Sequence, residues 1–419
     1  MRIRSSAFYG ISISLLLFGI AVHLSVAQVP VEPAGLHLTW QFDPTTTMTI
    51  DWHTEPGDQS DHVLQYKRIG SSDWQDMESS SLEYPYSDRT IHRVEITGLE
   101  PDTEYRFRVG EFTREYKFRT MPGQLDRPIR FAVGGDTGRG ETMRKVNRIA
   151  AQYDVEFVAW GGDLSYADGR AEEYERWHQW FENNMEGLIT DDGRVIPILT
   201  AIGNHEMKRQ RGGNYWFLFD DYEPTDQWRT ANAPYFMQLF AFPGQPGYGV
   251  LDFGDYMSIF LLDSDHANPV KGRQTRWLER EMRERDRRGV THIFPVYHIA
   301  AFPSHRSFTS RVQVNIREAW VPLFEKYGVR VAFEAHDHTY KRTHPILNEE
   351  ISGDGIVYIG DGAWGVRPRE GNNRDAWYIN QFASNNHAII VTLDGKTQEY
   401  IVVDEEGNVF DNYTDDRSR

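Results

Sequence analysis

Seven side chains with oxygen or nitrogen donor atoms follow short apolar segments, and three of them come directly after a glycine. The seven are Asp136, Asp163, Tyr166, Asn204, His298, His336 and His338. Aspartate and tyrosinate are hard oxygen donors that suit ferric iron, whereas imidazole and the amide carbonyl suit a divalent ion such as zinc, manganese or ferrous iron. A carboxylate between two cations can bridge them. The set therefore predicts a centre of two metal ions.

Two metal ions about 3.5–4 Å apart form a clamp that is used for in-line displacement at phosphorus. Such ions lower the pKa of bound water, which supplies hydroxide for the attack, and they neutralise the phosphoryl oxygens as charge develops. His336 and His338 are two residues apart, so in an irregular loop each can face a different ion. We therefore expect hydrolysis of phosphate esters without a covalent enzyme intermediate.

The segments that precede these donors have the length and composition of strands. They are residues 129–133, 155–160, 195–202, 291–297 and 329–333, and further strands are expected at 257–262, 356–359, 387–393 and 398–403. Helical patterns occur at 142–152, 172–185, 273–288 and 314–327. Strands that alternate with helices indicate an α/β domain with a mixed sheet. In open α/β sheets ligands collect beyond the carboxyl ends of strands, so five such junctions favour a shared site over isolated turns, caps or core residues.

Residues 35–120 have a different pattern, in which apolar and polar residues alternate over segments such as Met48–Trp52 and Tyr105–Val109. A period of two suits half-buried strands. The segment Leu99–Tyr105 resembles the corner before a late strand of fibronectin type III sandwiches, where a tyrosine hydroxyl can bind nearby backbone. We expect a small all-β sandwich that acts as a scaffold, joined to the α/β domain by a linker near residues 121–128.

The first 27 residues have the features of an export signal. Arg2 and Arg4 supply positive charge, an apolar stretch follows, and Ser25-Val26-Ala27 offers small residues for a signal peptidase. Cleavage would give a secreted or periplasmic protein with no stable membrane insertion, and an uncleaved anchor is the alternative. The chain contains no cysteine, which fits a bacterial exported protein and excludes thiolate ligands and cysteine nucleophiles.

Length and charge limit the class of protein and its partners. A chain of 419 residues suggests two domains. The formal net charge of -17 argues against a surface that neutralises nucleic-acid phosphates, so no nucleic-acid binding is expected. A small anionic substrate remains compatible, because bound metal ions can reverse the local field of a pocket. The expected partner is a small-molecule phosphate ester.

The motifs that carry the seven donors resemble those of the purple acid phosphatases, within the calcineurin-like metallophosphoesterase superfamily. The motifs read Gly135-Asp136-Thr137-Gly138, Gly162-Asp163-Leu164-Ser165-Tyr166, Gly203-Asn204-His205-Glu206, Pro295-Val296-Tyr297-His298 and Ala335-His336-Asp337-His338. The last two depart from the family pattern at Pro295, where valine is usual, and at Ala335, where glycine is usual. Neither departure removes a donor side chain. The resemblance implies a catalytic domain over residues 128–403 and a fibronectin type III-like domain over 35–120.

The resemblance also implies a role for each residue. A ferric site would be made by Asp136, Tyr166 and His338, and a divalent site (zinc, manganese or iron) by Asn204, His298 and His336, with Asp163 as the bridge. Tyr166 favours the ferric–divalent pair, since tyrosinate bound to ferric iron gives the purple colour. His205 would bind phosphate or protonate the leaving alkoxide. His305 is a second catalytic candidate, and its alternative is an exposed loop histidine.

Other interpretations of the same residues remain open at this point. The same centre could hydrolyse phosphodiesters, such as nucleotides or lipid headgroups, because pocket shape decides the substrate. The chain could instead be a non-catalytic binding protein, although loss of metal ligands would be the sign of that. Trp40, Trp52 and Trp74 could form a platform for a sugar, but their place in alternating segments favours core packing.

Overall fold

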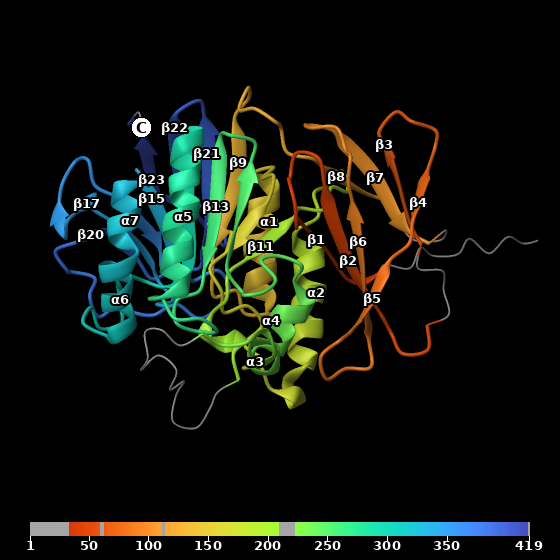
Figure 1. Ribbon diagram of the computed structural model, residues 1–419, viewed down its shortest axis with the longest axis horizontal. Helices are drawn as coiled ribbons and strands as arrows, with labels where there is room; N and C mark the ends of the chain where they lie inside the picture. Colours follow the sequence, from red (N-terminus) through yellow and green to blue (C-terminus); the bar gives the residue numbers. More distant parts are fainter. Residues whose placement is uncertain (1–32, 59–62, 111–113, 209–222, 418–419) are drawn as a thin grey trace, which may run out of the picture.

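The computed structural model describes residues 33–58, 63–110, 114–208 and 223–417. The export signal predicted at residues 1–27 lies outside these ranges and stays a prediction. Among the described residues, no helix combines the length and the apolar character that a membrane span requires. Figure 1 shows a β-rich N-terminal part on one side of the molecule and a larger layered part beside it.

The N-terminal part is a sandwich of two four-stranded antiparallel sheets, in the orders β1-β2-β6-β5 and β4-β3-β7-β8. The strands are β1 (Ala34–Thr39), β2 (Met48–Thr54), β3 (Leu64–Arg68), β4 (Gln75–Met77), β5 (Ser80–Glu83), β6 (Thr90–Ile96), β7 (Glu104–Val109) and β8 (Tyr116–Arg119). The hydroxyl of Tyr105 accepts a hydrogen bond from the backbone N–H of Glu100 at 2.9 Å. The corner expected from the sequence is therefore present.

Core packing explains the alternating tryptophans of this sandwich. Trp40 and Trp52 are fully buried, which confirms the packing interpretation and leaves neither ring free to stack on a sugar. Trp74 is partly exposed, and the cationic groups of Lys67 and Arg108 lie over its ring at 4.5 and 4.6 Å. No platform of three tryptophans exists on this surface.

The larger part contains two mixed sheets that pack face to face. The six-stranded sheet has the order β11-β10-β9-β21-β22-β23, in which β9 (Ile129–Gly134), β10 (Val158–Trp160) and β11 (Ile198–Thr200) are parallel, and β21 (His387–Asp394), β22 (Thr397–Asp404) and β23 (Val409–Asp415) follow as antiparallel neighbours. Apolar rings from the two sheets meet between them, as in the 5.4 Å contact of Phe131 with Phe294. The core thus lies between the layers.

The second sheet has seven strands in the order β12-β13-β14-β15-β19-β16-β20. These are β12 (Gly249–Phe253), β13 (Met257–Leu262), β14 (His292–Ile299), β15 (Val331–Ala335), β16 (Tyr340–Thr343), β19 (Val357–Gly360) and β20 (Ile379–Ala383), with a short ribbon of β17 (Ile346–Leu347) and β18 (Glu350–Ile351). Strands β13, β14, β15 and β19 are parallel. Their carboxyl ends therefore lie at one edge, as the placement of the donors requires.

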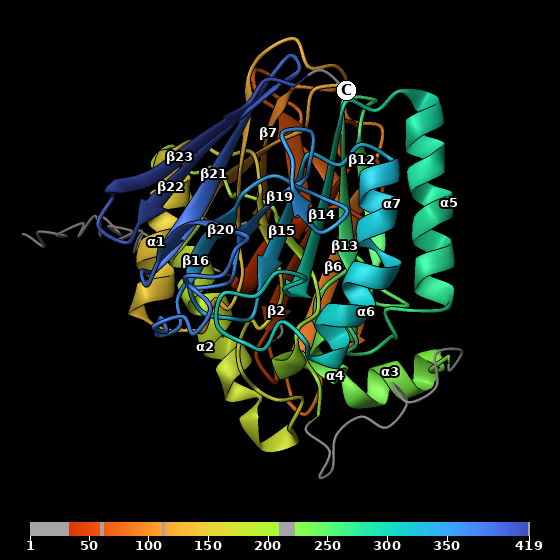
Figure 2. The same cartoon turned by 90° about the vertical axis from the view of Figure 1, so that its left-hand side faces the viewer.

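Helices cover the outer face of each sheet, which gives four layers (Figure 2). Helices α1 (Glu141–Gln152) and α2 (Glu175–Gly187) lie over the six-stranded sheet, whereas α5 (Arg273–Arg288), α6 (Arg311–Ala319) and α7 (Val321–Lys326) lie over the seven-stranded sheet. Two short helices, α3 (Asp226–Asn232) and α4 (Pro234–Leu239), precede β12. This arrangement confirms the predicted α/β class with a smaller all-β domain.

The prediction of one continuous helix near the end of the seven-stranded sheet's helical layer is wrong. The sequence predicts a single helix over residues 314–327, but the structure has α6 and α7, with Trp320 between them. Pro322 lies in the first turn of α7. Proline has no N–H and its ring clashes with the preceding turn, so it is tolerated at a helix start and not in an interior. The proline therefore separates the two helices.

The β sandwich is joined to the larger part by buried contacts. The ring of Trp40 packs edge-on against Phe157 and Phe253 at 5.9 and 5.8 Å. The backbone of Lys117 in β8 exchanges hydrogen bonds with Gly193 and Val195 at 2.8 and 2.9 Å.

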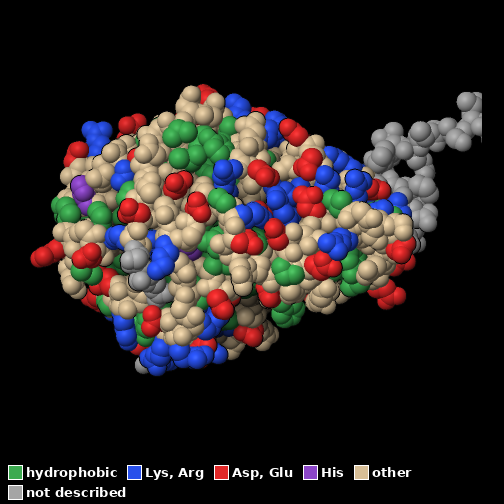
Figure 3. Space-filling view, turned by 90° about the horizontal axis from the view of Figure 1, so that it is seen from above, with side chains coloured by type: hydrophobic (Ala, Val, Ile, Leu, Met, Phe, Trp, Pro, Cys, Tyr) green, Lys and Arg blue, Asp and Glu red, His purple; other side chains and the backbone are tan. Residues whose placement is uncertain are grey.

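Figure 3 shows acidic and basic side chains interspersed over one face of the molecule, so on that face the net negative charge is not gathered in one area.

Candidate metal centre

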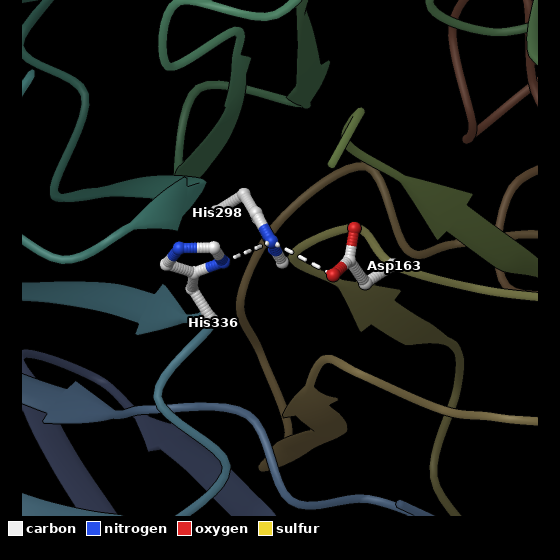
Figure 4. A group of neighbouring side chains, drawn as sticks. All are labelled: Asp163, His298 and His336. Atoms are coloured by element: carbon white, nitrogen blue, oxygen red, sulfur yellow. Dashed lines mark hydrogen bonds and ion pairs between the residues drawn. The ribbon is translucent and has the colours of Figure 1, made fainter. Parts of the chain in front are cut away.

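The first group of donors surrounds His298, whose residue lies in β14. Its Nε2 is 2.9 Å from Nδ1 of His336, 3.2 Å from Oδ2 of Asp163 and 3.3 Å from Oδ1 of Asn204. Figure 4 shows Asp163 and His336 converging on His298 from two sides. The other ring nitrogen, Nδ1, lies 2.9 Å from the carbonyl oxygen of Gly161. A proton on Nδ1 satisfies that carbonyl, so in the neutral imidazole the lone pair of Nε2 faces the lone pairs of the Asp163 and Asn204 oxygens.

The second group is formed by Asp136, Tyr166 and His338. The Tyr166 hydroxyl lies 3.1 Å from Oδ1 of Asp136 and 3.2 Å from Nε2 of His338, and the last two atoms are 3.0 Å apart. The three donors therefore form a triangle of nearly equal sides. An oxygen-rich triangle of this kind suits a hard cation.

Backbone hydrogen bonds hold the two groups together. The N–H of His336, which belongs to the first group, donates to Oδ2 of Asp136 at 2.7 Å. The N–H of Thr137 donates to the carbonyl oxygen of Asp163 at 3.0 Å. All seven predicted donors thus come together from strand ends that are far apart in the sequence.

The backbone around these donors adopts an uncommon conformation. Five of the seven donor residues, Asp136, Asp163, Tyr166, His336 and His338, have positive φ angles between 53° and 78°. This left-handed region is uncommon for residues other than glycine, and strained residues of this kind cost ~1–3 kcal/mol each. Strained residues cluster at active sites and ligand clamps, where the surrounding fold holds them in place. The backbone therefore gives independent support for a functional site here.

Glu206 has a structural role that the sequence motif alone did not reveal. It is almost fully buried, and its carboxylate accepts hydrogen bonds from the N–H groups of Gly203, Asp163 and Leu164, each at 2.8 Å. One side chain thus ties the loop that follows β10 to the loop that follows β11. The motif Gly203-Asn204-His205-Glu206 predicts the donor Asn204, but it does not show that Glu206 binds a second loop.

His205 stands beside the donors and does not belong to either group. Its Nδ1 lies 2.5 Å from Oδ1 of Asp168, and its Nε2 lies 3.8 Å from Oδ2 of Asp163. Its ring packs on Tyr166 with the centroids 4.2 Å apart. The ring is therefore oriented by Asp168, with Nε2 on the side of the donors. Sequence analysis missed Asp168, although it lies two residues after Tyr166.

His305 lies on a neighbouring loop, and in the described part of the chain no hydrogen bond or ion pair joins it to the seven donors. Its N–H donates to Oδ2 of Asp337 at 2.6 Å. Its ring is partly exposed, and its Nδ1 is buried without a hydrogen-bond partner in the described part of the chain. Burial lowers the pKa of His305, Asp337 raises it, and the nearby cations Arg369 and Arg306 lower it again. The residue therefore stands near the centre, but a catalytic role stays a prediction.

A buried charge cluster beneath this loop holds it in position. Lys341 is fully buried and binds Glu334 and Asp361 together with the carbonyl oxygen of Phe302. Glu334 also accepts the N–H of Ala301 at 2.6 Å, and Asp361 accepts the N–H of Ser304 at 3.1 Å. Buried charges are tolerated when they are paired and hydrogen-bonded. Nothing in the sequence pairs these residues, because they come from different strands and loops.

Both departures from the family pattern are accommodated locally. The methyl group of Ala335 lies where a side chain on Gly135 or Gly161 would meet it, so facing glycines make room for it. Pro295 lies inside β14, three residues before His298. Proline removes one ladder donor from the strand, and β14 still pairs with β13 in regular register through Tyr297. Neither residue displaces a donor side chain.

The pKa values within the first group show which members carry charge when no cation is bound. Burial raises the pKa of Asp163, but His298 and then His205 and His336 lower it below its usual value. Burial lowers the pKa of His298, but Asp163 and Asp136 outweigh it and raise the pKa to about 9. Burial and His298 hold the pKa of His336 well below its usual value. One proton thus substitutes for the positive charge that this set of donors attracts.

In the second group, burial is the main reason that the pKa of Tyr166 lies well above its usual value, and the carboxylates of Asp136 and Asp163 raise it further. Loss of this proton requires a strong positive charge close to the phenol oxygen. A trivalent cation in the triangle would supply such a charge.

Both parts of the chain match models of known protein families. Residues 33–120 match the family model of the purple acid phosphatase N-terminal domain, and residues 129–340 match that of the calcineurin-like phosphoesterases. Purple acid phosphatase 21 of Arabidopsis thaliana is 28% identical over 289 residues, which cover 68% of this chain and 61% of the relative. Purple acid phosphatase 18 of the same plant is 27% identical over 380 residues, which cover 86% and 77%.

Solved structures share the fold at low sequence identity. A purple acid phosphatase from yellow lupin (Lupinus luteus) seeds superposes with a TM-score of 0.74 at 18% identity, over 91% of this chain and 74% of that chain. The structure of PhoD superposes with a TM-score of 0.62 at 12% identity, over 90% and 92%. These likenesses extend over both parts of the molecule.

Proposed function

The chain belongs to the calcineurin-like phosphoesterase family, and we propose that it is a metal-dependent hydrolase of phosphoric esters of the purple acid phosphatase type, with phosphomonoesters as substrates. The observation that carries the proposal is the convergence of lone pairs on His298, where Asp163, Asn204 and His336 approach one nitrogen within 3.3 Å. The carboxylate oxygen of Asp163 and the amide oxygen of Asn204 carry lone pairs that repel the lone pair of this nitrogen unless a cation or a proton lies between them. The donor set therefore fits metal ions.

The proposed ions are ferric iron in the triangle of Asp136, Tyr166 and His338, and a divalent ion (zinc, manganese or iron) at Asn204, His298 and His336. Asp163 would bridge them. Tyrosinate and aspartate support the harder ion, and the two imidazoles with an amide support the softer one. When bound, the two ions would supply Lewis acidity toward the phosphoryl oxygens and a lowered pKa for water.

The chain's own residues supply orientation and proton transfer. Asp168 accepts a hydrogen bond from Nδ1 of His205 at 2.5 Å, which fixes the orientation of the ring. A proton on Nε2 can then be donated to the leaving alkoxide, or to a phosphoryl oxygen in the ground state. Glu206 keeps Asp163 in place through the backbone bonds described above. His305 is the second candidate for a contact with the substrate, because its Nδ1 has no hydrogen-bond partner in the described part of the chain.

Two other functions receive less support. The named relatives are purple acid phosphatases, which does not favour an exported phosphodiesterase as the alternative. A non-catalytic binding protein would be expected to lose ligands, whereas all seven donors converge. We also propose export to the periplasm or the medium, on the strength of the signal-like residues 1–27.

Two substitutions test the proposal. Asp163→Asn and His298→Ala should each lower metal content per chain and reduce kcat toward p-nitrophenyl phosphate more than about 100-fold, because losing a direct ligand exceeds the effect of losing an outer-shell partner. Asp375→Asn, whose side chain is 95% exposed, is the matched control and should behave like the wild type. Wild-type turnover and metal content in either variant would refute the assignment of that residue. A wild type without activity toward any phosphate ester would refute the function itself.

The choice between ester classes needs a separate assay. Turnover of p-nitrophenyl phosphate should exceed that of bis(p-nitrophenyl) phosphate. The opposite preference would support the phosphodiesterase alternative, with the same metal centre.

A further inference from the structure

A buried imidazole lies beside the metal donors, and the chemistry described above does not use it. His266 is 4% exposed and follows β13, which pairs in parallel with β14, the strand of His298. The two imidazole rings are in contact, with their centroids 5.4 Å apart and their planes at 62°. Burial lowers the pKa of this imidazole to about 3, while His298 lowers it further, Asp163 raises it and His205 lowers it again. The ring therefore lies within electrostatic reach of the donors and of the candidate proton donor.

One hydrogen bond determines which ring nitrogen of His266 carries the proton. Ser264 is fully buried, and its Oγ accepts the backbone N–H of Ile299 at 2.8 Å. Within the described ranges the only other hydrogen bond of this hydroxyl joins it to Nε2 of His266 at 3.2 Å. A serine hydroxyl has one proton to donate, and a buried O–H group without an acceptor is costly, so the proton of Ser264 is donated to Nε2. The proton of the ring itself is therefore on Nδ1.

The Nδ1–H group of His266 is a donor without an acceptor. In the part of the chain that the structure describes, no hydrogen bond or ion pair reaches this nitrogen. The loop that carries the ring is held firmly, because the backbone N–H of His266 donates to Oδ1 of the buried Asp263 at 2.8 Å. Oδ2 of the same carboxylate accepts the N–H of Ala267 and the side-chain amide of Asn268, each at 2.9 Å. Since buried polar groups are normally paired, an unpaired N–H on a fixed loop beside the donors indicates a partner that binds there.

We propose that the Nδ1–H group of His266 donates a hydrogen bond to an oxygen of the phosphoryl group that is hydrolysed. The inference rests on the proposed function and adds a contact with the substrate on the side of His298. The donor keeps its proton throughout the reaction, so it acts by stabilising the negative charge on the phosphoryl oxygen as the bond to the leaving group breaks. This contact makes His266 a catalytic residue in addition to His205. The competing explanation is that His266 only packs against His298 and keeps that ring in place.

Two substitutions separate a contact with the substrate from packing against His298. His266→Phe keeps an aromatic ring but has no N–H, whereas His266→Asn loses the ring and keeps an amide N–H near the position of Nδ1. Both remove the acceptor of the Ser264 proton, so they share that cost. His266→Phe should weaken the binding of inorganic phosphate to the metal-loaded protein, measured by calorimetric titration, and lower kcat/KM for p-nitrophenyl phosphate, each at least about tenfold. His266→Asn should stay within about threefold of the wild type in both quantities.

Two further variants complete the experiment. His266→Ala removes the N–H without adding atoms, so it should show the same losses as His266→Phe and replaces that variant if the larger ring prevents folding. His53→Phe is the control, because it makes the same change at a buried histidine of β2 whose ring nitrogens also have no hydrogen-bond partner in the described ranges. It should bind and turn over phosphate compounds like the wild type.

The outcomes separate this inference from the proposed function. The inference is overturned if the variants without the N–H bind phosphate as the wild type does, or if His266→Asn loses as much as His266→Phe. A loss of metal content in His266→Phe also overturns it, because the residue would then support His298 and not the substrate. A wild type that binds phosphate but hydrolyses no phosphate ester defeats the proposed function, while the comparison of phosphate binding still decides the inference.

Discussion

Replacing Glu206 by glutamine tests whether one buried carboxylate organises the centre without touching a metal ion. Its two oxygens accept three backbone N–H groups, those of Gly203, Asp163 and Leu164, all at 2.8 Å. Glutamine has the same shape but offers one oxygen and one NH₂ group. Whichever way the amide turns, its NH₂ group faces at least one backbone N–H, so at least one hydrogen bond is replaced by a contact between two donors.

The size of the effect follows from that count. A hydrogen bond to a charged acceptor contributes about 1.5–3 kcal/mol, and a buried donor left without an acceptor costs about 1–3 kcal/mol. The amide orientation that turns its oxygen toward Gly203 and Asp163 loses only the bond from Leu164, which sets the lower limit near 2 kcal/mol. A change of 2 kcal/mol corresponds to about a 30-fold change in an equilibrium constant. If the whole cost falls on metal binding, we expect metal affinity to fall about 30-fold. If it falls on folding, the free energy of unfolding of the metal-free protein should fall by about 2 kcal/mol. The cost can also be shared between the two quantities.

The assay is a titration of the metal-free protein with zinc, together with urea unfolding of the same sample. The control is Glu182→Gln, which makes the same chemical change at an exposed position of α2. The reasoning is refuted if Glu206→Gln matches the wild type both in zinc affinity and in the free energy of unfolding.

Three further predictions follow from the same geometry. Asp168→Asn removes the carboxylate that orients His205, so kcat toward p-nitrophenyl phosphate should fall about 100-fold with metal content unchanged; a kcat within threefold of the wild type would contradict this role. Gly362→Ala should lower metal content and the thermal midpoint, because a methyl group there overlaps the carboxylate of Asp136 and the position has a φ of +71°; a variant with unchanged metal content would argue against this packing. Burial lowers the pKa of His387 to about 4, below its value of about 6.5 in the unfolded chain, so its contribution to stability is complete above pH 6.5 and is lost as the pH falls toward 4. His387→Gln should therefore lose about 2 kcal/mol less stability than the wild type between pH 7 and pH 5 in urea unfolding, and equal losses would contradict the shift.

The seven donors could be predicted from the sequence because the residue types alone show which side chains can donate to a metal ion. Asp136, Asn204 and His338 lie in short motifs at strand ends, and parallel strands bring such ends to one edge. The structure places all seven donors within two adjoining groups, while their roles as metal ligands stay predictions. The sandwich could be predicted for a similar reason, since alternation of apolar and polar residues is a local signal.

The supporting residues could not be predicted because their partners are distant in the sequence. Lys341 has the sequence signature of an exposed residue, yet it is fully buried with Glu334 and Asp361. Arg369 follows a stretch without regular structure, and only the folded chain brings it to His338. The strands β16, β20 and β23 were also not anticipated, because their sequences carry charged or polar residues on both faces and their pairing depends on neighbours in the sheets.

The most direct test of the central claim is anomalous X-ray diffraction from crystals of the protein isolated with its native metals. The account predicts two peaks of anomalous density about 3.5–4 Å apart. One would be coordinated by Asp136, Tyr166 and His338, the other by Asn204, His298 and His336, and Asp163 would lie between them. A single peak, or peaks outside these side chains, would contradict the two-metal centre.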